Sequence, residues 1–399
     1  MLYIKIIWFE PLHMPELETI LQSTHVNNDD KESAIYEMAR IIISEQFYDK
    51  LAELCQSLRK LWSNLTGARA SKIMKRIVGL IPPQDFNLAL LFEAKMIEWC
   101  QKEELKYLKL FFLTKRVGML YEIREYEKCL ENIGELSTEL KKMNDKANLI
   151  TLYIYESKTY YEMQNMSRAK ASLTSARALA VTTFSPSYIQ AQIELLAGMY
   201  LCEDRQYASA FSNFMEALDG FNQSKCYPEA CLTVRYLVLS KIIANRWNEI
   251  NALLKNKNVQ SYLGDGIIKI LVRLGESCKQ RDLSGYDRII RENYETIKDN
   301  FILSHLAYLN DLLLDSNILK LIEPYLNVSI SYLAEQLSFP VSAIEAKLRK
   351  LILDGRINGI LDYYTGTLVM YEKGEDSVTE KNYFEMMKAI SAFIDSGNK

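Results

Sequence analysis

The chain has 399 residues and a formal net charge of −3, with 49% hydrophobic and 25% charged residues. A compact chain of this length buries about three quarters of its unfolded surface, so core size sets no limit. Its slight acidity argues against nucleic acid as the main partner, because phosphate-binding domains usually carry a basic excess. Only 8 Pro and 15 Gly residues favour a mainly helical fold.

No apolar run reaches the about 18 residues that a transmembrane helix needs. Residues 1–9 are apolar, but Lys5 interrupts them and no small-residue cleavage site follows, which favours a packing segment over a signal peptide. The 7 cysteines are scattered, and the closest pair, Cys226 and Cys231, has no histidine nearby. We expect reduced thiols of an intracellular protein rather than a zinc site.

Helical periodicity begins after a short N-terminal segment, residues 1–30. Apolar residues recur mostly at threes and fours over residues 33–65, which predicts helix with a break near Ser44. A second helix is expected over residues 71–80, before two prolines, and a third over residues 86–101.

The next part of the chain is repetitive. Similar helix openings occur at Tyr126, Ser167 and Tyr207, each after a longer helix with an aromatic residue near its end. Two pairs of alanines are related by a shift of 39 residues: Ala171 corresponds to Ala210, and Ala178 corresponds to Ala217. Small residues at such a period are typical of tetratricopeptide-like helix pairs, which stack because one pair cannot bury its apolar face alone. We therefore predict a helical-repeat solenoid over residues 31–225.

Further helices are predicted over residues 226–322, at 227–244, 247–254, 265–278, 283–297 and 301–322. They lead into residues 323–372 without a Pro/Gly/Ser-rich linker. There, a helix beginning at Ser329 is followed by a second one, with Ser342 as N-cap and Glu345 at the capping-box spacing. Ile344, Leu348, Leu351 and Ile352 form its apolar face.

After this second helix the hydrophobic period changes. Two short apolar runs, residues 357–361 and 368–370, are joined by a turn at Thr365 and Gly366. Two helices followed by two short strands form a winged-helix pattern. The fold class expected for the whole chain is therefore mainly α, a solenoid followed by a winged helix and a C-terminal helix.

The winged helix has two alternative readings. A DNA-reading version places basic side chains on the second helix, where Lys347, Arg349, Lys350 and Arg356 occur. Three acidic residues lie among these basic residues and offset their positive charge: Glu335, Glu345 and Asp354. We therefore favour a solvated helix face over a nucleic-acid site.

The last predicted helix, over residues 379–396, has a narrow apolar stripe. Tyr383, Met387, Ile390 and Ile394 step by four, three and four, which is the a/d spacing of a coiled coil. A lone helix with such a stripe exposed would aggregate, so we expect a partner helix.

The sequence offers no constellation for catalysis. The three histidines, His13, His25 and His305, stand alone, and such residues are mostly structural. Asp265 lies between two glycines, but this lone Gly-x-Gly does not follow a strand and is not a nucleotide-binding motif. We predict no enzyme activity, no catalytic residues, no cofactor and no metal.

A helical-repeat segment fused to a winged helix and a terminal helix resembles the PCI-domain proteins, which occur in the proteasome lid, the signalosome and translation initiation factor three. Within that class, residues 139–147, 156–161 and 171–177 are similar to one family of 26S proteasome lid subunits, that of non-ATPase regulatory subunit eleven (six in the yeast scheme). Asn358 and Tyr363 depart from the family, which usually has His and Gln there.

The resemblance implies a non-catalytic scaffold for ubiquitin-dependent protein degradation in the cytoplasm and nucleus. It also makes residues 226–322 the helical part of a PCI domain. The implied partners in this hetero-oligomer are other PCI-type lid subunits, the proteasomal ATPase ring and the outer ring of the core particle, with no membrane and no nucleic acid. A signalosome subunit is the alternative within the class, and a nucleic-acid-binding winged helix the alternative outside it.

The resemblance also implies two interfaces. Winged helices in this family continue one sheet edge to edge, and an exposed edge at residues 357–361 or 368–370 would offer unpaired backbone groups for this. The expected winged-helix interface comprises Ile357, Asn358, Gly359, Ile360, Leu361, Asp362, Leu368, Val369 and Met370. The expected C-terminal interface comprises Tyr383, Phe384, Met387, Ile390, Phe393 and Ile394.

Overall fold

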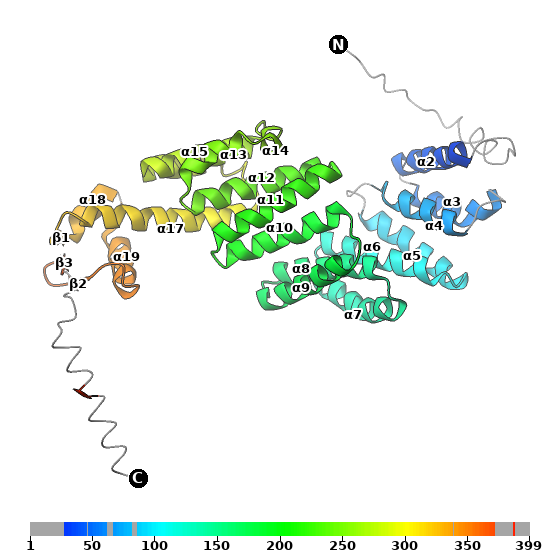
Figure 1. The fold of residues 1–399 in the computed structure, drawn as a ribbon, viewed down its shortest axis with the longest axis horizontal. Coiled ribbons are helices and arrows are strands. Elements are labelled where there is room, and N and C mark those ends of the chain that lie inside the picture. Colours follow the sequence, from blue (N-terminus) through cyan, green and yellow to red (C-terminus); the bar gives the residue numbers. More distant parts are fainter. Residues whose placement is uncertain are drawn as a thin grey trace, which may run out of the picture. The chain divides into compact units, whose positions relative to one another are not determined.

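The computed structural model describes residues 28–45, 47–61, 67–81, 86–337, 339–371 and 386–387. The chain divides into two compact units between Tyr227 and Pro228. The first unit contains only helices in its described residues, and the second contains helices and a three-stranded sheet (Figure 1). The predicted fold class, a helical solenoid followed by a winged helix, is confirmed.

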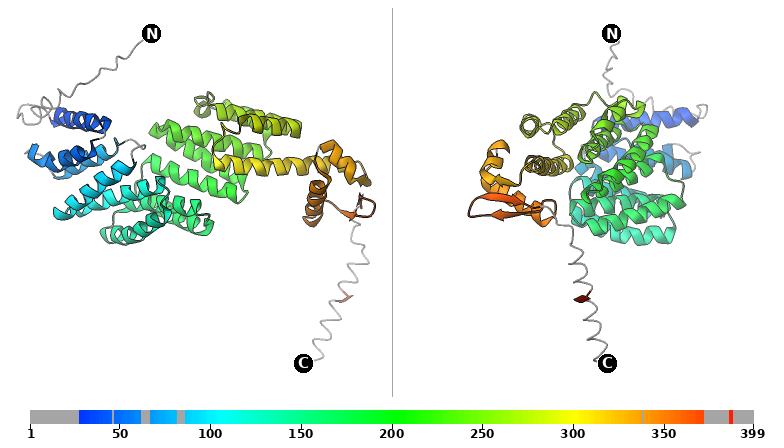
Figure 2. Two further views of the ribbon diagram at one scale, coloured as in Figure 1. Left: turned by 180° about the vertical axis from the view of Figure 1, so that it is seen from behind. Right: turned by 60° about the vertical axis from the view of Figure 1, so that its left-hand side comes forward.

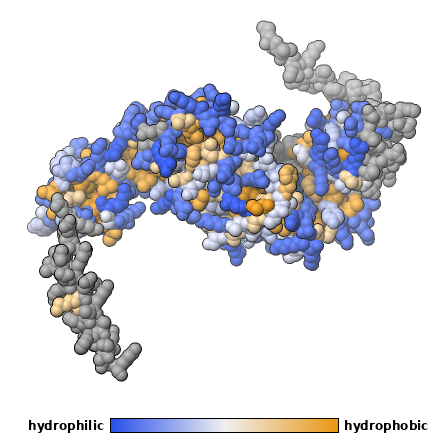
Figure 3. Space-filling view, in the orientation of Figure 1, coloured by the Kyte–Doolittle hydropathy of each residue, from blue (hydrophilic) through white to orange (hydrophobic). Residues whose placement is uncertain are grey.

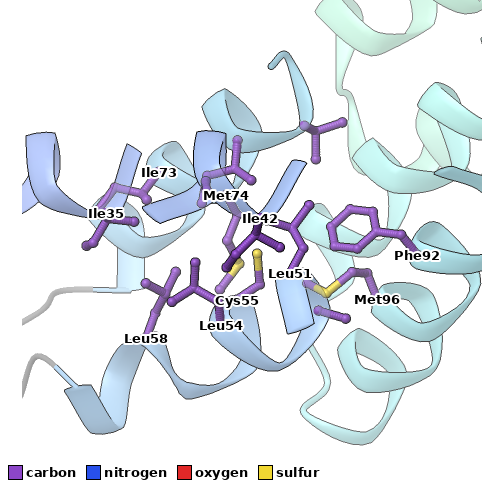
Figure 4. Close-up of a cluster of buried hydrophobic side chains, with 14 of the residues drawn as sticks. Ile35, Ile42, Leu51, Leu54, Cys55, Leu58, Ile73, Met74, Phe92 and Met96 are labelled. Carbon is purple, nitrogen blue, oxygen red and sulfur yellow. The ribbon is translucent and has the colours of Figure 1, made fainter. Parts of the chain in front are cut away.

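Within its described residues, the first unit begins with four helices: α2 (Asn28–Ser44), α3 (Tyr48–Leu61), α4 (Gly67–Val78) and α5 (Phe86–Lys102). The long apolar run breaks after Ser44, as predicted. The apolar stripes of these helices converge on one core cluster (Figure 4). Its fully buried members include Ile35, Leu51, Leu58, Ile73 and Phe92.

Six further helices continue this unit: α6 (Lys106–Glu122), α7 (Tyr126–Met143), α8 (Lys146–Glu162), α9 (Met166–Thr182), α10 (Ser187–Glu203) and α11 (Tyr207–Ser224). Neighbours in sequence pack against each other, α8 on α9 and α10 on α11. The second helices of successive pairs begin at Tyr126, Met166 and Tyr207, so the repeat is 40 and then 41 residues long. This is the predicted helix-pair solenoid.

The alanine match behind the 39-residue shift was wrong. Ala171 and Ala178 are exposed. The residues equivalent to the buried Ala210 and Ala217 are Ala169 and Ala176, which have no exposed surface. Alignment of the helix starts requires a shift of 41 residues, and that alignment puts all four small side chains on the packed face.

One left-handed residue ends most helices of the repeat. Arg124, Asn144, Gln164, Arg205 and Lys225 all have φ between 54° and 67°. This conformation costs a non-glycine residue about 1 kcal/mol, and here it closes each turn within two or three residues.

The turn between α9 and α10 is different. None of its residues has positive φ, Thr183 is extended, and Pro186 is the N-cap of α10. Helix α9 therefore ends in an extended segment, without the left-handed residue of the neighbouring turns. Phe184 stands at the position of the left-handed residue and is 98% exposed.

The helices of the second unit are α12 (Tyr227–Ile243), α13 (Trp247–Leu254), α14 (Lys257–Gln260), α15 (Gly266–Gln280), α16 (Leu283–Asn293) and α17 (Asn300–Ile322). All were predicted except the one-turn helix α14, which is too short to show a period. The Tyr236 hydroxyl donates to Asp299 at 2.8 Å, and the Tyr286 hydroxyl donates to the Leu306 carbonyl at 2.7 Å. These contacts fix α17 against α12 and α16.

The winged helix follows α17 directly (Figure 2). It comprises β1 (Asn327–Ser329), α18 (Ile330–Leu337), α19 (Val341–Leu353), β2 (Gly359–Asp362) and β3 (Thr367–Met370). The strands are antiparallel in the order β1-β3-β2. Its core joins α17 to both helices and the sheet, and includes Ile318, Val328, Leu333, Leu348 and Leu368.

Two local expectations for the winged helix were wrong. Ser329 ends strand β1 and does not begin a helix, because Asn327, Val328 and Ser329 pair with β3. Ser342 is not the N-cap of α19. Pro340 takes that position with extended backbone and no side-chain cap, so Ser342 lies inside the first turn.

Candidate subunit interface

The winged-helix sheet has one buried and one outward side. Val328, Leu368 and Leu361 are directly opposite one another across the three strands and face the core. The next row, Asn327, Val369 and Ile360, faces outward because successive strand residues alternate sides. Ile360 is 62% exposed and Val369 38%, so this side carries an apolar strip.

Only one of the two alternative strand edges is free. The expectation that residues 368–370 form an edge was wrong, because β3 is the central strand and pairs with β1 and β2. The β2 strand pairs with β3 on one side and has no partner on its other side among the described residues. An edge of this kind can recruit a strand from another chain.

The pattern of hydrogen bonds between β2 and β3 shows which backbone N–H and C=O groups of β2 point to its free edge. The Tyr371 N–H donates to the Asn358 carbonyl at 3.0 Å. Backbone bonding alternates along an antiparallel pair, so Ile360 and Asp362 also direct their groups toward β3. Gly359 and Leu361 then direct their N–H and C=O groups to the free edge.

The nine predicted winged-helix residues have different positions. Ile357 and Leu368 are core residues that no partner can touch. Gly359 lies so close to β3 that an added Cβ would be 2.8 Å from the Val369 carbonyl, so it is required for strand pairing. Asn358, Leu361, Asp362 and Met370 are half-buried. The residues that present side chains to the outside are Ile360 and Val369.

Three exposed tyrosines beside this strip were not predicted. Tyr363 is 62% exposed, Tyr364 99% and Tyr371 51%. The turn that carries the first two is held by Asp362, which accepts from the Thr365 hydroxyl at 2.7 Å and the Tyr364 N–H at 2.9 Å. These bonds, led by that of Thr365, lower the pKa of the Asp362 carboxyl. Two adjacent tyrosines before a Thr-Gly turn were the available signal, since a hairpin turn is exposed.

Three of the four basic residues considered for nucleic-acid binding have partners within the domain, and Arg356 lies beyond the end of α19 rather than on it. The Lys347 ammonium lies 3.1 Å from Asp315 and 3.3 Å from Asp311, both on α17. Arg356 lies 3.5 Å from the other oxygen of Asp315. The Arg349 guanidinium lies 5.8 Å from the centre of the Tyr363 ring. Three of the four candidate phosphate-binding side chains therefore hold the winged helix together.

The expected C-terminal interface lies mostly outside the described residues. Met386 and Met387 are helical and exposed, at 63% and 61%. Tyr383, Phe384, Ile390, Phe393 and Ile394 are not among the residues that the structure describes, so the coiled-coil stripe stays a prediction.

Other candidate sites have structural explanations. His305 is buried, with its ring edge-on to Phe301 at 4.4 Å between centres. Asp265, between the two glycines, is the N-cap of α15, and its carboxylate accepts from Arg235 at 2.6 Å. All seven cysteines are free thiols. Over the described ranges, no three His, Cys, Asp or Glu residues are grouped to hold a metal ion.

The viewed face of the described surface is mostly hydrophilic, with smaller hydrophobic areas between (Figure 3). None of the helices that the structure describes has the length and apolar character of a bilayer span.

Comparisons with known proteins identify two families. The PCI domain matches residues 290–372, and the family described as the 26S proteasome regulatory subunit RPN6 N-terminal domain matches residues 13–123. The 26S proteasome non-ATPase regulatory subunit 11 of Dictyostelium discoideum is 30% identical over 371 residues, 92% of this chain and 90% of that protein. The probable 26S proteasome regulatory subunit rpn6 of Schizosaccharomyces pombe is 29% identical over 370 residues, 92% of this chain and 88% of that protein.

Proposed function

The chain belongs to the family of 26S proteasome regulatory subunit RPN6, also called non-ATPase regulatory subunit 11, and we propose that it is a non-catalytic scaffold subunit of the proteasome lid. The observation that carries this proposal is the free β2 edge, bordered by Ile360, Val369 and exposed tyrosines. Backbone groups at an edge provide affinity for an added strand, and the neighbouring side chains provide selectivity.

We propose three kinds of neighbour. Other PCI-type lid subunits join at the winged helix through the β2 edge and at the C-terminal helix through the stripe of Tyr383, Phe384, Met387, Ile390, Phe393 and Ile394. The ATPase ring and the outer ring of the core particle contact the N-terminal helices. In this arrangement the chain holds lid, ATPase ring and core particle together for ubiquitin-dependent degradation, in the cytoplasm and nucleus.

The domain assignment follows the same proposal. Residues 31–225 form the solenoid, residues 226–322 the helical part of the PCI domain, and residues 323–372 the winged helix. Residues 1–30 precede the solenoid, and residues 379–396 supply the assembly helix.

The test is affinity purification of the full-length tagged chain at physiological salt, with the co-purified proteins identified by mass spectrometry. We expect lid, ATPase and core-particle subunits. Deletion of residues 379–399 is expected to remove most lid subunits from the eluate. A wild-type eluate without proteasome subunits would refute the proposal, and a deletion variant that assembles normally would refute the role of the C-terminal helix.

A further inference from the structure

A groove of about 380 Å³ lies on the first unit, where α9, α10 and α11 meet. Its floor includes three small residues, Ala180, Ala191 and Gly220, beside the buried Ile193. A Cβ added to Gly220 would lie 2.9 Å from the Ala191 side chain, so α10 and α11 approach as closely as a glycine allows. The small floor is what leaves the groove open to an incoming side chain.

The walls of the groove are acidic. Glu194, Glu216 and Asp219 line it, with Arg177 as the one cation among the lining residues. The Arg177 guanidinium donates to Glu194 at 2.6 Å. Burial raises the pKa of Glu194, and the charge of Glu216 adds to this against the effect of Arg177. Among the lining residues there are thus two more carboxylates than cations, a balance that favours a basic ligand.

One part of the rim of the groove is apolar and exposed. Val181 lines the groove and is 83% exposed, and Phe184 follows it in the irregular α9–α10 turn with 98% of its surface exposed. The turn departs from the pattern of its neighbours at the residue that carries this phenyl ring. An exposed ring beside a groove with this excess of carboxylates combines an apolar contact with a charge contact.

We propose that this groove receives a Lys or Arg side chain from a partner protein, and that an apolar residue next to it in the partner contacts Phe184 and Val181. The aliphatic stem of a long basic side chain fits over a floor of small residues, and its charged end then lies among the carboxylates. A nucleic acid or an anionic lipid surface would be repelled by the same carboxylates. The inference rests on the proposed function in one respect, since the partner is expected to be a proteasome subunit.

Photo-crosslinking identifies the partner segment. Phe184 is replaced by benzoylphenylalanine in the tagged full-length chain, the complex is purified and irradiated, and the crosslinked peptide is sequenced by mass spectrometry, whatever proteins have eluted. We expect one dominant peptide with a Lys or Arg beside an apolar residue. Absence of a protein crosslink, or a crosslink to an acidic segment, overturns the inference. An eluate that lacks proteasome subunits counts against the proposed function alone.

A binding measurement then tests the charge contact. The crosslinked segment is synthesised with a fluorescein label, and its Kd for the purified full-length chain is measured by anisotropy. Glu216→Lys is expected to weaken binding about tenfold, and the wild-type Kd should rise with NaCl concentration. Glu131→Lys, the same charge change at an exposed position of α7, should stay within about twofold of the wild type. Equal affinity of Glu216→Lys and wild type would overturn the proposal.

Discussion

Gly198 of α10 lies directly against the ring of Phe214 of α11. A Cβ added to Gly198 would be 2.5 Å from Cε1 and 2.7 Å from Cδ1 of that ring. Phe214 has no exposed surface, so the ring cannot move aside into solvent. The glycine is therefore required by helix packing and not by backbone conformation.

Gly198→Ala is expected to destabilise the first unit by about 2 kcal/mol, because one added carbon overpacks a filled core. The measurement is urea unfolding of the full chain followed by circular dichroism. Gly134→Ala is the matched control, since a Cβ there meets nothing within 4 Å. It should stabilise α7 by about 0.5–1 kcal/mol. Equal effects of the two changes would contradict the packing argument.

Glu93 in α5 makes the stability of the first unit depend on pH. The residue has no exposed surface, and within the described part of the chain neither carboxylate oxygen has a hydrogen-bond partner. Burial raises the pKa of this carboxyl to about 8, although Arg116 and Lys115 act in the opposite direction. The folded state therefore keeps a proton that the unfolded chain releases near its ordinary pKa of 4.5.

The stabilisation that comes from this proton is fully present below pH 4.5. It is lost progressively as the pH rises from 4.5 to about 8, and the free energy of unfolding falls by up to about 1.4 kcal/mol per pH unit. Glu93→Gln should remove this slope and raise Tm most at pH 8. The measurement is Tm of the full chain between pH 5 and 9. Glu98→Gln, at an exposed position of the same helix, should keep the wild-type slope. If Glu93→Gln kept the wild-type dependence of Tm on pH, another titratable group would be the cause of that dependence.

Asp315 is the carboxylate that holds the winged helix on α17. It is 7% exposed and lies within ion-pair distance of Lys347 and Arg356. Asp315→Ala leaves the 15% exposed Lys347 side chain with only Asp311, and should cost about 3 kcal/mol.

Hydrogen exchange of residues 327–371 measures this loss of local stability. Asp311→Asn is the control, since Asp311 is 59% exposed and its loss should cost less than about 1 kcal/mol. If both changes had the same effect, the buried pair would not be what anchors the winged helix.

Ile360→Lys tests the β2 edge in assembly. The side chain is outward and 62% exposed, so the substitution should leave the Tm of the full chain unchanged. A lysine at an edge opposes strand addition, and we expect about tenfold less co-purified lid subunit. Leu353→Lys places the same charge at an 82% exposed position of α19, outside the sheet. Normal assembly of Ile360→Lys would exclude this edge as the contact.

Most of the helical fold follows from the sequence because its apolar periods are long. Helix starts at Tyr126 and Tyr207 and the break after Ser44 were predicted where they occur. The register of the repeat was not predicted correctly. Ala169 and Ala171 are both alanines, and the sequence does not reveal which of them lies on the packed side of the helix. Strand β1 was missed because three residues show no period, and its pairing with β3 joins residues far apart in the chain.

The strands of the candidate interface were predicted, and their use as an interface stays a prediction. Its position near residues 357–370 follows from the strand pattern and the resemblance. Which edge is free depends on strand order, which a sequence pattern does not contain. Two of the predicted contact residues, Ile357 and Leu368, turned out to be core, since alternation in such short strands does not reveal the buried side. Tyr363 and Tyr364 are exposed beside β2 and were not among the predicted contact residues.

The central place of β3 sets an order of events during synthesis. Val369 is paired with Asn327 on one side and Ile360 on the other, although β3 is synthesised after both of these strands. Until Met370 has been made, neither β1 nor β2 has a partner in this sheet. A chain truncated before that point lacks the sheet that presents the β2 edge, so assembly through this edge requires synthesis past Met370.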